Sequence, residues 1–100
     1  MQVSRLDEAD RAAVLEQLPL WSYDADAKGI RRTLRFADFA EAFGFMARVA
    51  ILAEKADHHP EWFNVYNRLE VWLCTHDAGN QVTDKDRKLA EKLDQLFAAG

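Results

Sequence analysis

The stretch ADHHPEWFNVYNRLEVWLCTHD, residues 56–77, contains the change from helix to sheet that decides the fold. Pro60 biases His59 away from helical backbone angles, so a helix that arrives from the N-terminal side should end at the histidine pair. A short extended segment is expected over residues 62–66. Apolar and polar side chains then alternate over residues 68–75, which is the period of a strand with one buried face.

A long helix is predicted before this stretch, over residues 38–57. Asp38-Phe39-Ala40-Glu41 has the form of a capping box at its start. Its apolar residues cover about half of the helix circumference, which is wider than packing on one sheet requires. We therefore expect this helix to pack on its own sheet and also on another subunit. The two apolar rows are Phe39, Phe43, Met46, Ala50 and Ala53, and Phe45, Val49, Leu52 and Ala56.

The rest of the chain predicts two more helices and a hairpin. Capping boxes at Ser4-Arg5-Leu6-Asp7 and Thr83-Asp84-Lys85-Asp86 begin an N-terminal and a C-terminal helix. Alternation over residues 21–36 predicts a hairpin in which Gly29 supplies a positive φ. The order α-β-β-α-β-β-α indicates an α+β fold, with an antiparallel sheet of three to four strands packed on one side by helices.

Length and composition limit the classes of function. One hundred residues, 49% of them hydrophobic, fit a single domain over residues 1–100. The net charge of −4 gives no electrostatic case for direct nucleic acid binding. No apolar run is long enough for a membrane span, and the N-terminus has no signal-peptide pattern. Cys74 is the only cysteine, which favours a packing residue in a reducing compartment, so we expect a cytoplasmic protein.

The three histidines, His58, His59 and His76, all lie between Glu54 and Asp86. They could be ordinary surface or core residues, zinc ligands around an open position, or metal-free acids and bases beside a flat ligand. The adjacency of His58 and His59 counts against a metal, because neighbouring side chains diverge. The aromatic side chains nearby suit a ligand that gains from stacking; they are Trp62, Phe63 and Tyr66.

Two carboxylates are candidates to orient these histidines. Glu54 is four residues before His58 and shares its face if the helix reaches that far. Asp86 belongs to the capping box of the last helix, and it could also hold a histidine ring nitrogen. Carboxylate-held histidine is the usual way to fix a tautomer for general acid–base work.

The segment from Glu54 to Asn67, followed by Thr75-His76-Asp77, resembles the signature of pterin-4a-carbinolamine dehydratases. The signature combines an acid, a His-His-Pro, an aromatic residue, a third histidine and a downstream aspartate. The element order and Trp21 also fit, so the resemblance covers nearly the whole chain. The loop between His76 and the aspartate is one residue longer here than is usual, and the Thr83 capping box points to Asp86 as the matching position.

The resemblance implies dehydration of 4a-hydroxytetrahydropterin to quinonoid dihydropterin, which recycles the pterin cofactor of aromatic amino-acid hydroxylases. It implies no metal and no bound cofactor, a small-molecule pterin substrate, and a homodimer or homotetramer. It also implies roles for six residues: His58 and His76 as the acid–base pair, His59 for substrate binding, Glu54 and Asp86 as orienting carboxylates, and Trp62 as a wall of the pterin pocket.

A different class of function also fits the sequence. The same fold could serve as a non-catalytic dimerisation or assembly module that docks through the helix over residues 38–57. In that case Phe45 or Val49 would be essential, and the histidines would not.

Overall fold

The computed structural model of the chain describes residues 8–75 and 82–99. Its elements follow the expected order, and the α+β class is confirmed. The Ser4 capping box lies outside the described residues. The elements are α1 (Glu8–Gln17), β1 (Ser22–Asp24), β2 (Gly29–Arg35), α2 (Phe39–Ala56), β3 (Glu61–Val65), β4 (Arg68–Leu73) and α3 (Asp84–Ala99).

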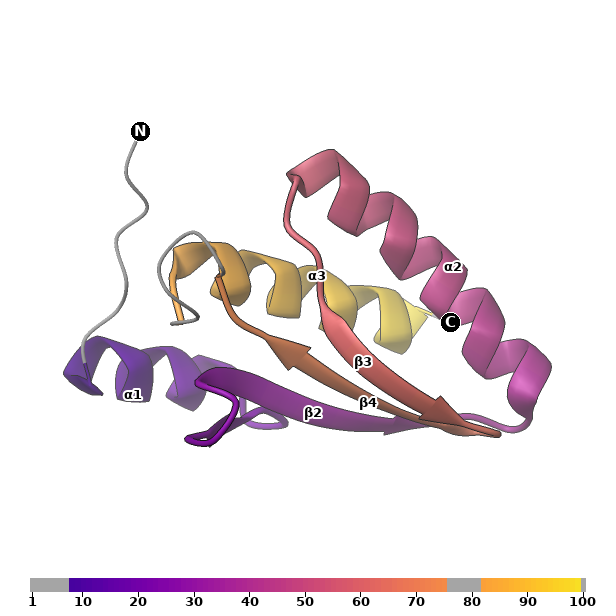
Figure 1. Cartoon of the computed structure of the whole chain (residues 1–100), viewed down its shortest axis with the longest axis horizontal. Helices are drawn as coiled ribbons and strands as arrows, with labels where there is room; N and C mark the ends of the chain where they lie inside the picture. Colours follow the sequence, from indigo (N-terminus) through magenta and orange to yellow (C-terminus); the bar gives the residue numbers. More distant parts are fainter. Residues whose placement is uncertain (1–7, 76–81, 100) are drawn as a thin grey trace.

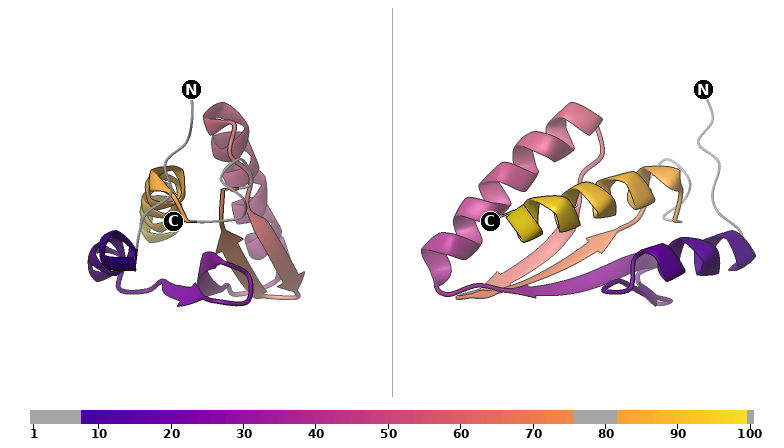
Figure 2. Two further views of the ribbon diagram at one scale, coloured as in Figure 1. Left: turned by 60° about the vertical axis from the view of Figure 1, so that its left-hand side comes forward. Right: turned by 180° about the vertical axis from the view of Figure 1, so that it is seen from behind.

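The four strands form one antiparallel sheet in the order β1-β2-β4-β3. Leu69 of β4 pairs with Leu34 of β2 on one side and with Asn64 of β3 on the other. Helices α2 and α3 lie on the same side of this sheet (Figures 1 and 2). Helix α1 lies beside β1, where the Arg11 guanidinium is 3.7 Å from the centroid of the Tyr23 ring.

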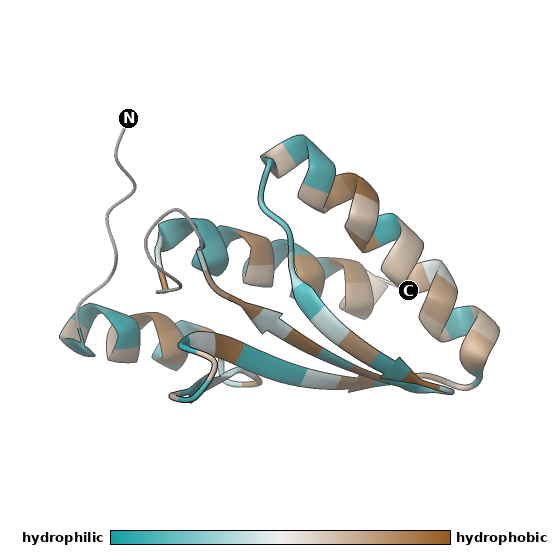
Figure 3. Cartoon of the chain, viewed as in Figure 1, coloured by the Kyte–Doolittle hydropathy of each residue, from teal (hydrophilic) through white to brown (hydrophobic). Residues whose placement is uncertain are grey.

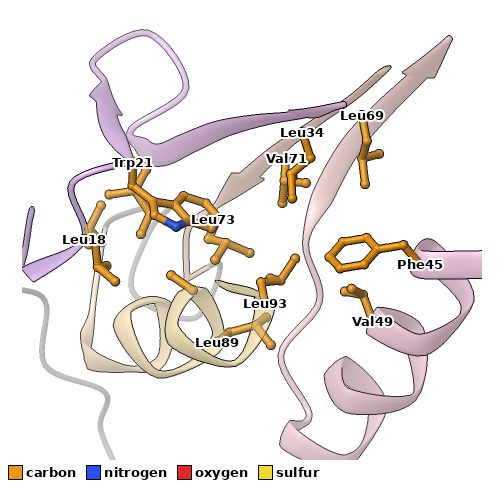
Figure 4. Close-up of a cluster of buried hydrophobic side chains, with 13 residues drawn as sticks. Leu18, Trp21, Leu34, Phe45, Val49, Leu69, Val71, Leu73, Leu89 and Leu93 are labelled. Atoms are coloured by element: carbon orange, nitrogen blue, oxygen red, sulfur yellow. The ribbon is translucent and has the colours of Figure 1, made fainter. Parts of the chain in front are cut away.

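The core lies between the sheet and the two long helices. Buried and half-buried residues alternate along β4, as the sequence predicts (Figure 3 shows the matching change in hydropathy). Each fully buried aliphatic side chain contributes about 1.5–3 kcal/mol to the free energy of unfolding. Figure 4 shows the side chains that meet here, among them Leu69, Val71 and Leu73 of β4, Phe45 and Val49 of α2, and Leu89 and Leu93 of α3.

The predicted hairpin is present, but Gly29 has a different role from the expected one. The positive φ belongs to Lys28, at 56°. Gly29 is already part of β2, where a Cβ atom would come within 2.7 Å of the Leu73 carbonyl oxygen. Glycine is needed here because β2 approaches the end of β4 closely. The Asp24 side chain closes the turn by accepting from the backbone N–H groups of Asp26 and Ala27.

Helix α2 presents one face to the core and a second apolar face outward. Phe45 and Val49 are buried in the chain's own core, so they cannot form the docking surface that the alternative of an assembly module assigned to them. They lie on the stripe that faces the sheet, and packing of α2 on its own sheet is confirmed. The outward side chains Phe39, Phe43 and Ile51 form what we call the outer row. Contact of α2 with another subunit stays a prediction, which now concerns the outer row.

No helix within residues 8–75 and 82–99 has both the length and the apolar composition that crossing a membrane requires.

Candidate active site

The end of helix α2 determines where the two neighbouring histidines go. The helix ends at Ala56, and Asp57 adopts a left-handed conformation with φ 51° and ψ 43°. The backbone N–H of Asp57 then bonds to the Glu54 carbonyl, and that of His58 bonds to the Ala53 carbonyl. This pair of bonds is a Schellman motif. It reverses the chain direction, so residues 58 and 59 no longer follow helical spacing.

The start of helix α3 brings a carboxylate into the core. The backbone N–H of Thr83 donates to Oδ2 of Asp86 at 2.8 Å, and the Thr83 hydroxyl accepts from the Lys85 backbone N–H at 3.2 Å. The first is the return bond of the predicted capping box, and in the second the N-cap side chain bonds to the N2 position rather than to N3. Asp86 is fully buried, with 0% of its surface exposed. A buried carboxylate requires several hydrogen bonds, and the cap supplies only one of them.

His58 supplies a second hydrogen bond to Asp86. Its Nε2 lies 2.5 Å from Oδ1 of Asp86, and the His58 side chain is only 7% exposed. A hydrogen bond between an imidazole and a carboxylate is among the stronger ones in proteins, and burial strengthens it further. The predicted contact of Asp86 with a histidine is therefore present, although the loop before it is one residue longer than usual.

Glu54 does not orient His58 as expected. Oε1 of Glu54 instead lies 2.8 Å from Nε2 of His59. The reason is the left-handed Asp57, which ends the helix before the four-residue spacing can place His58 above Glu54. Both partners face solvent, with 58% of the His59 side chain and 80% of the Glu54 side chain exposed.

The two histidines line different cavities. His59 and Glu54 border a cavity of about 630 Å³ whose walls are mainly apolar and include Trp62. His58 borders a smaller one of about 220 Å³ against helix α3. The two cavities share no lining residue. The other residues of the larger cavity are Ala50, Ile51, Ala53, Lys55 and Pro60, and those of the smaller one are Ala56, Lys85, Lys88, Leu89 and Lys92.

Cys74 lies close to this region but is not suited to nucleophilic chemistry. Burial raises the pKa of its thiol, and the negative charges of Glu61 and Asp86 raise it further. A thiol with a raised pKa stays protonated at neutral pH and reacts poorly. The interpretation of Cys74 as a packing residue agrees with its buried position.

Thr75 also belongs to the site, although its sequence position did not lead us to expect a role for it there. Its hydroxyl donates to Oδ2 of Asp86 at 2.9 Å and lies 2.5 Å from the Thr83 hydroxyl. Thr75 occupies a position that the alternation assigns to the buried face, where a hydroxyl needs a partner. That mismatch between a polar residue and an inward position is the signal that could have revealed it.

His76, the third predicted histidine, lies outside the described residues. Within residues 8–75 and 82–99, no three histidine, cysteine, aspartate or glutamate side chains come together as a group that could hold a metal ion.

The described geometry defines a class of protein. The protein is an α+β domain. The buried aspartate at the start of α3 is hydrogen-bonded to a histidine that comes after α2 in the chain. Such a carboxylate-held histidine is an arrangement typical of proton-transfer sites.

Comparison with known proteins identifies the family. The family described as pterin 4 alpha carbinolamine dehydratase matches residues 4–96. A relative from Novosphingobium aromaticivorans, named "putative pterin-4-alpha-carbinolamine dehydratase", is 54% identical over 97 residues, which is 97% of this chain and 100% of the relative. One of the same name from Rhodopseudomonas palustris is 55% identical over 96 residues, covering 96% of this chain and 94% of the relative.

A solved structure agrees with these relatives. It is the crystal structure of a transcriptional coactivator/pterin dehydratase from Brucella melitensis, which is 46% identical and superimposes with a TM-score of 0.87. The match covers 93% of this chain and 98% of that one. The chain belongs to the pterin-4a-carbinolamine dehydratase family, as the resemblance in its sequence indicated.

Proposed function

We propose that this protein dehydrates 4a-hydroxytetrahydropterin to quinonoid dihydropterin and water. The observation that carries the proposal is the buried bond between His58 and Asp86, found in a chain that belongs to this family. A buried carboxylate that holds an imidazole is a costly arrangement, and it favours a function that needs a histidine in one fixed orientation.

The reaction requires two proton transfers. The bond between C4a and the hydroxyl oxygen breaks as that oxygen takes up a proton and leaves as water. The electron pair of N5 forms the new double bond to C4a, and N5 loses its proton. One group therefore acts as an acid and another as a base, and each such group contributes about 10²–10⁴-fold to the rate. By family resemblance these groups are His58 and His76, and the reaction needs neither a metal nor a bound cofactor.

In this proposal the residues of the larger cavity hold the pterin, and its C4a edge has to reach His58, which lines the smaller cavity. The larger cavity's volume of about 630 Å³ is in the usual range for small-molecule sites. Trp62 offers an aromatic surface to a flat heterocycle, and His59 and Glu54 offer hydrogen-bonding groups that already contact each other. Glu54 would thus orient the binding histidine, His59, and Asp86 would orient the proton-transfer histidine, His58.

The decisive test is a dehydration assay on enzymatically generated 4a-hydroxytetrahydropterin. The wild-type protein should exceed the uncatalysed rate. His58→Ala and His76→Ala should lower kcat, whereas His59→Ala should mainly raise KM. If the wild-type protein does not exceed the uncatalysed rate, the proposed dehydratase activity is refuted. Full activity in all three variants would overturn the assigned roles.

A separate measurement tests whether the reaction needs a metal. Metal analysis of active protein should find no stoichiometric zinc, and chelator treatment should leave kcat/KM unchanged. Stoichiometric zinc together with loss of activity on chelation would favour a hydrolase-like metal site instead.

We also propose that the protein is a cytoplasmic homodimer or homotetramer, with the outer row of α2 at a subunit contact. The supporting observation is the apolar row itself, because Phe39, Phe43 and Ile51 leave large apolar surfaces exposed on one helix face. Phe43→Glu should shift the mass measured by light scattering toward the monomer, and Glu41→Gln, on the same helix, should not. An unchanged mass in the Phe43→Glu protein would exclude this surface as the contact.

The second candidate function, a non-catalytic dimerisation or assembly module, would use the same outer row. It predicts that Phe43→Glu abolishes the biological function while His58→Ala retains it. The opposite result would favour the dehydratase.

A further inference from the structure

The carboxylate of Asp86 is the centre of a buried network that extends beyond His58. Oδ1 contacts Nε2 of His58, and Oδ2 accepts from both the Thr75 hydroxyl and the Thr83 backbone N–H. Thr75, Thr83 and Asp86 are all buried, with exposed fractions of 2%, 0% and 0%. Three elements contribute: the end of β4, the start of α3, and the segment after α2.

The directions of the hydrogen bonds in this network follow from counting protons. Each threonine hydroxyl carries one proton. Thr75 gives its proton to Asp86, so the 2.5 Å contact between the two hydroxyl oxygens must use the proton of Thr83. The Thr83 oxygen in turn accepts from the Lys85 backbone N–H. In the opposite direction, the Thr83 proton would have no acceptor among the described residues, which is costly for a buried hydroxyl.

This direction has a consequence for His58. Oδ2 of Asp86 already accepts from two donors, which leaves Oδ1 as the acceptor that faces His58. A carboxylate can only accept, so Nε2 of His58 must be the donor in their contact. The ring nitrogen left for proton exchange is then Nδ1. No hydrogen bond to Nδ1 is found within residues 8–75 and 82–99.

We propose that Thr75 and Thr83 are positioning residues that hold Asp86 as a hydrogen-bond acceptor and thereby fix His58 with its proton on Nε2 and Nδ1 available to the substrate. This inference rests on the proposed function for its effect on catalysis. Its effect on the tautomer of His58 can be measured without substrate. A purely structural role would instead be limited to capping α3 and filling the core, and would leave the His58 tautomer unchanged.

The variant that tests this is Thr75→Val, which replaces the hydroxyl by a methyl group of similar size. Thr75→Ser restores the hydroxyl and is the rescue variant. Thr33→Val is the matched control, because it makes the same chemical change on the exposed face of β2. If Thr75→Val does not fold, as judged by circular dichroism and a cooperative urea transition, Thr75→Ala takes its place.

Two measurements are made on each folded variant. The ¹⁵N chemical shifts of the His58 ring, assigned from the signals lost in His58→Gln, report which nitrogen carries the proton. In Thr75→Val the signal of Nε2 should move toward the value of an unprotonated nitrogen, because Asp86 with fewer donors can take the Nε2 proton while Nδ1 takes a proton from solvent, which leaves a neutral ring protonated on Nδ1. The kcat should fall about 10- to 100-fold. This is the range found when a hydrogen-bonding partner that orients a metal-bound histidine is mutated. KM should change by less than about twofold, since the substrate-binding histidine is His59.

The outcomes separate this inference from the proposed function. Recovery of both readouts in Thr75→Ser, with no change in Thr33→Val, would support it. An unchanged His58 tautomer in Thr75→Val would overturn it, whatever happens to kcat, because the effect would not pass through His58. A changed tautomer with unchanged kcat would overturn the catalytic part. A wild-type protein without dehydratase activity that still shows the tautomer change would defeat the proposed function and keep the assignment of Thr75.

Discussion

His58 and His59 are neighbours in the chain but lie in opposite environments. His58 is buried and bonded to a fully buried aspartate, which itself has two further donors. His59 is exposed and bonded to a glutamate that is more exposed still. The left-handed backbone of Asp57 and the proline after His59 separate the two side chains. One short turn thus produces two sites of different physical character.

The difference between the two sites fits the separate roles proposed for His58 and His59. A buried, fully bonded imidazole has one orientation and one tautomer, which proton transfer to a fixed atom requires. An exposed pair contributes little to stability, because water competes for both partners, and it can adapt to a ligand. The comparison therefore supports His58 as the proton-transfer residue and His59 as a substrate contact. Mutations that affect only one of the two sites test this comparison.

The largest effect is expected for Asp86→Ala. The substitution removes the acceptor for His58, Thr75 and the Thr83 backbone N–H, and leaves these buried donors without a partner. The free energy of unfolding should fall by about 3–5 kcal/mol, as for other buried pairs that lose one member. Urea denaturation of the variant and the wild type measures this. Asp86→Asn keeps the size and one acceptor oxygen, so its free energy of unfolding should fall less. A loss below about 1 kcal/mol for Asp86→Ala would show that the hydrogen bonds of the network contribute little to stability.

The next effect compares the two histidines directly. His58→Ala should lower the free energy of unfolding by about 2 kcal/mol or more, since it leaves a cavity and removes one donor from Asp86. His59→Ala should change it by less than about 0.5 kcal/mol, as is usual for an exposed position. Thermal and urea unfolding of both variants provide the test. Equal losses would mean that burial does not distinguish the two sites, and the comparison would fail.

These contrasts also show what the sequence could and could not predict. The strand alternation and the capping boxes at Asp38 and Thr83 predicted their elements, since each depends on local spacing. The Thr83 capping box also placed Asp86 at the start of α3. Which histidine meets which carboxylate depended on the left-handed Asp57, and a non-glycine residue in that conformation has no strong local signature.

Two further residues show the same limit. Gly29 was expected to supply a positive φ, but its role is a close approach to Leu73, which lies 44 positions further along the chain. Thr75 was expected as a strand residue and as part of the family signature but received no role in the site, because its partners Thr83 and Asp86 come from another element. Contacts between distant segments are set by tertiary packing, so periodicity alone does not contain them.

A third prediction asks whether hydrogen bonds can matter at the half-buried carboxylate of Asp24. The Ala27 backbone N–H lowers the pKa of Asp24 below its ordinary value of 3.8, and the hydrogen bond from the Trp72 indole N–H lowers it further. A lowered folded-state pKa stabilises the fold above the unfolded-state value, and this contribution disappears as the pH falls through the folded-state pKa. The stability difference between wild type and Asp24→Asn should thus be constant at neutral pH and shrink below about pH 4.

The control for this prediction is Asp26→Asn, because Asp26 takes part in the same turn only through its backbone N–H. Its stability difference from the wild type should show no comparable pH dependence. If Asp24→Asn differs from the wild type equally at pH 2.5 and pH 7, the bonds from Ala27 and Trp72 do not stabilise the charged form, in conflict with the direction of the pKa shift.

The smallest effect on stability is expected for Glu54→Gln, and this variant sharpens the comparison most. Both partners of the Glu54–His59 pair are exposed, so the free energy of unfolding should change by less than about 0.5 kcal/mol. If Glu54 orients the substrate-binding histidine, KM for the pterin should nonetheless rise while kcat stays close to wild type. Steady-state kinetics at low and at high salt measure kcat and KM. Salt should raise KM of the wild type more than that of Glu54→Gln, because salt screens the exposed Glu54–His59 pair. A fall in kcat with KM unchanged would place Glu54 with the proton-transfer residues. It would contradict the assignment of proton transfer to His58 and of substrate binding to His59.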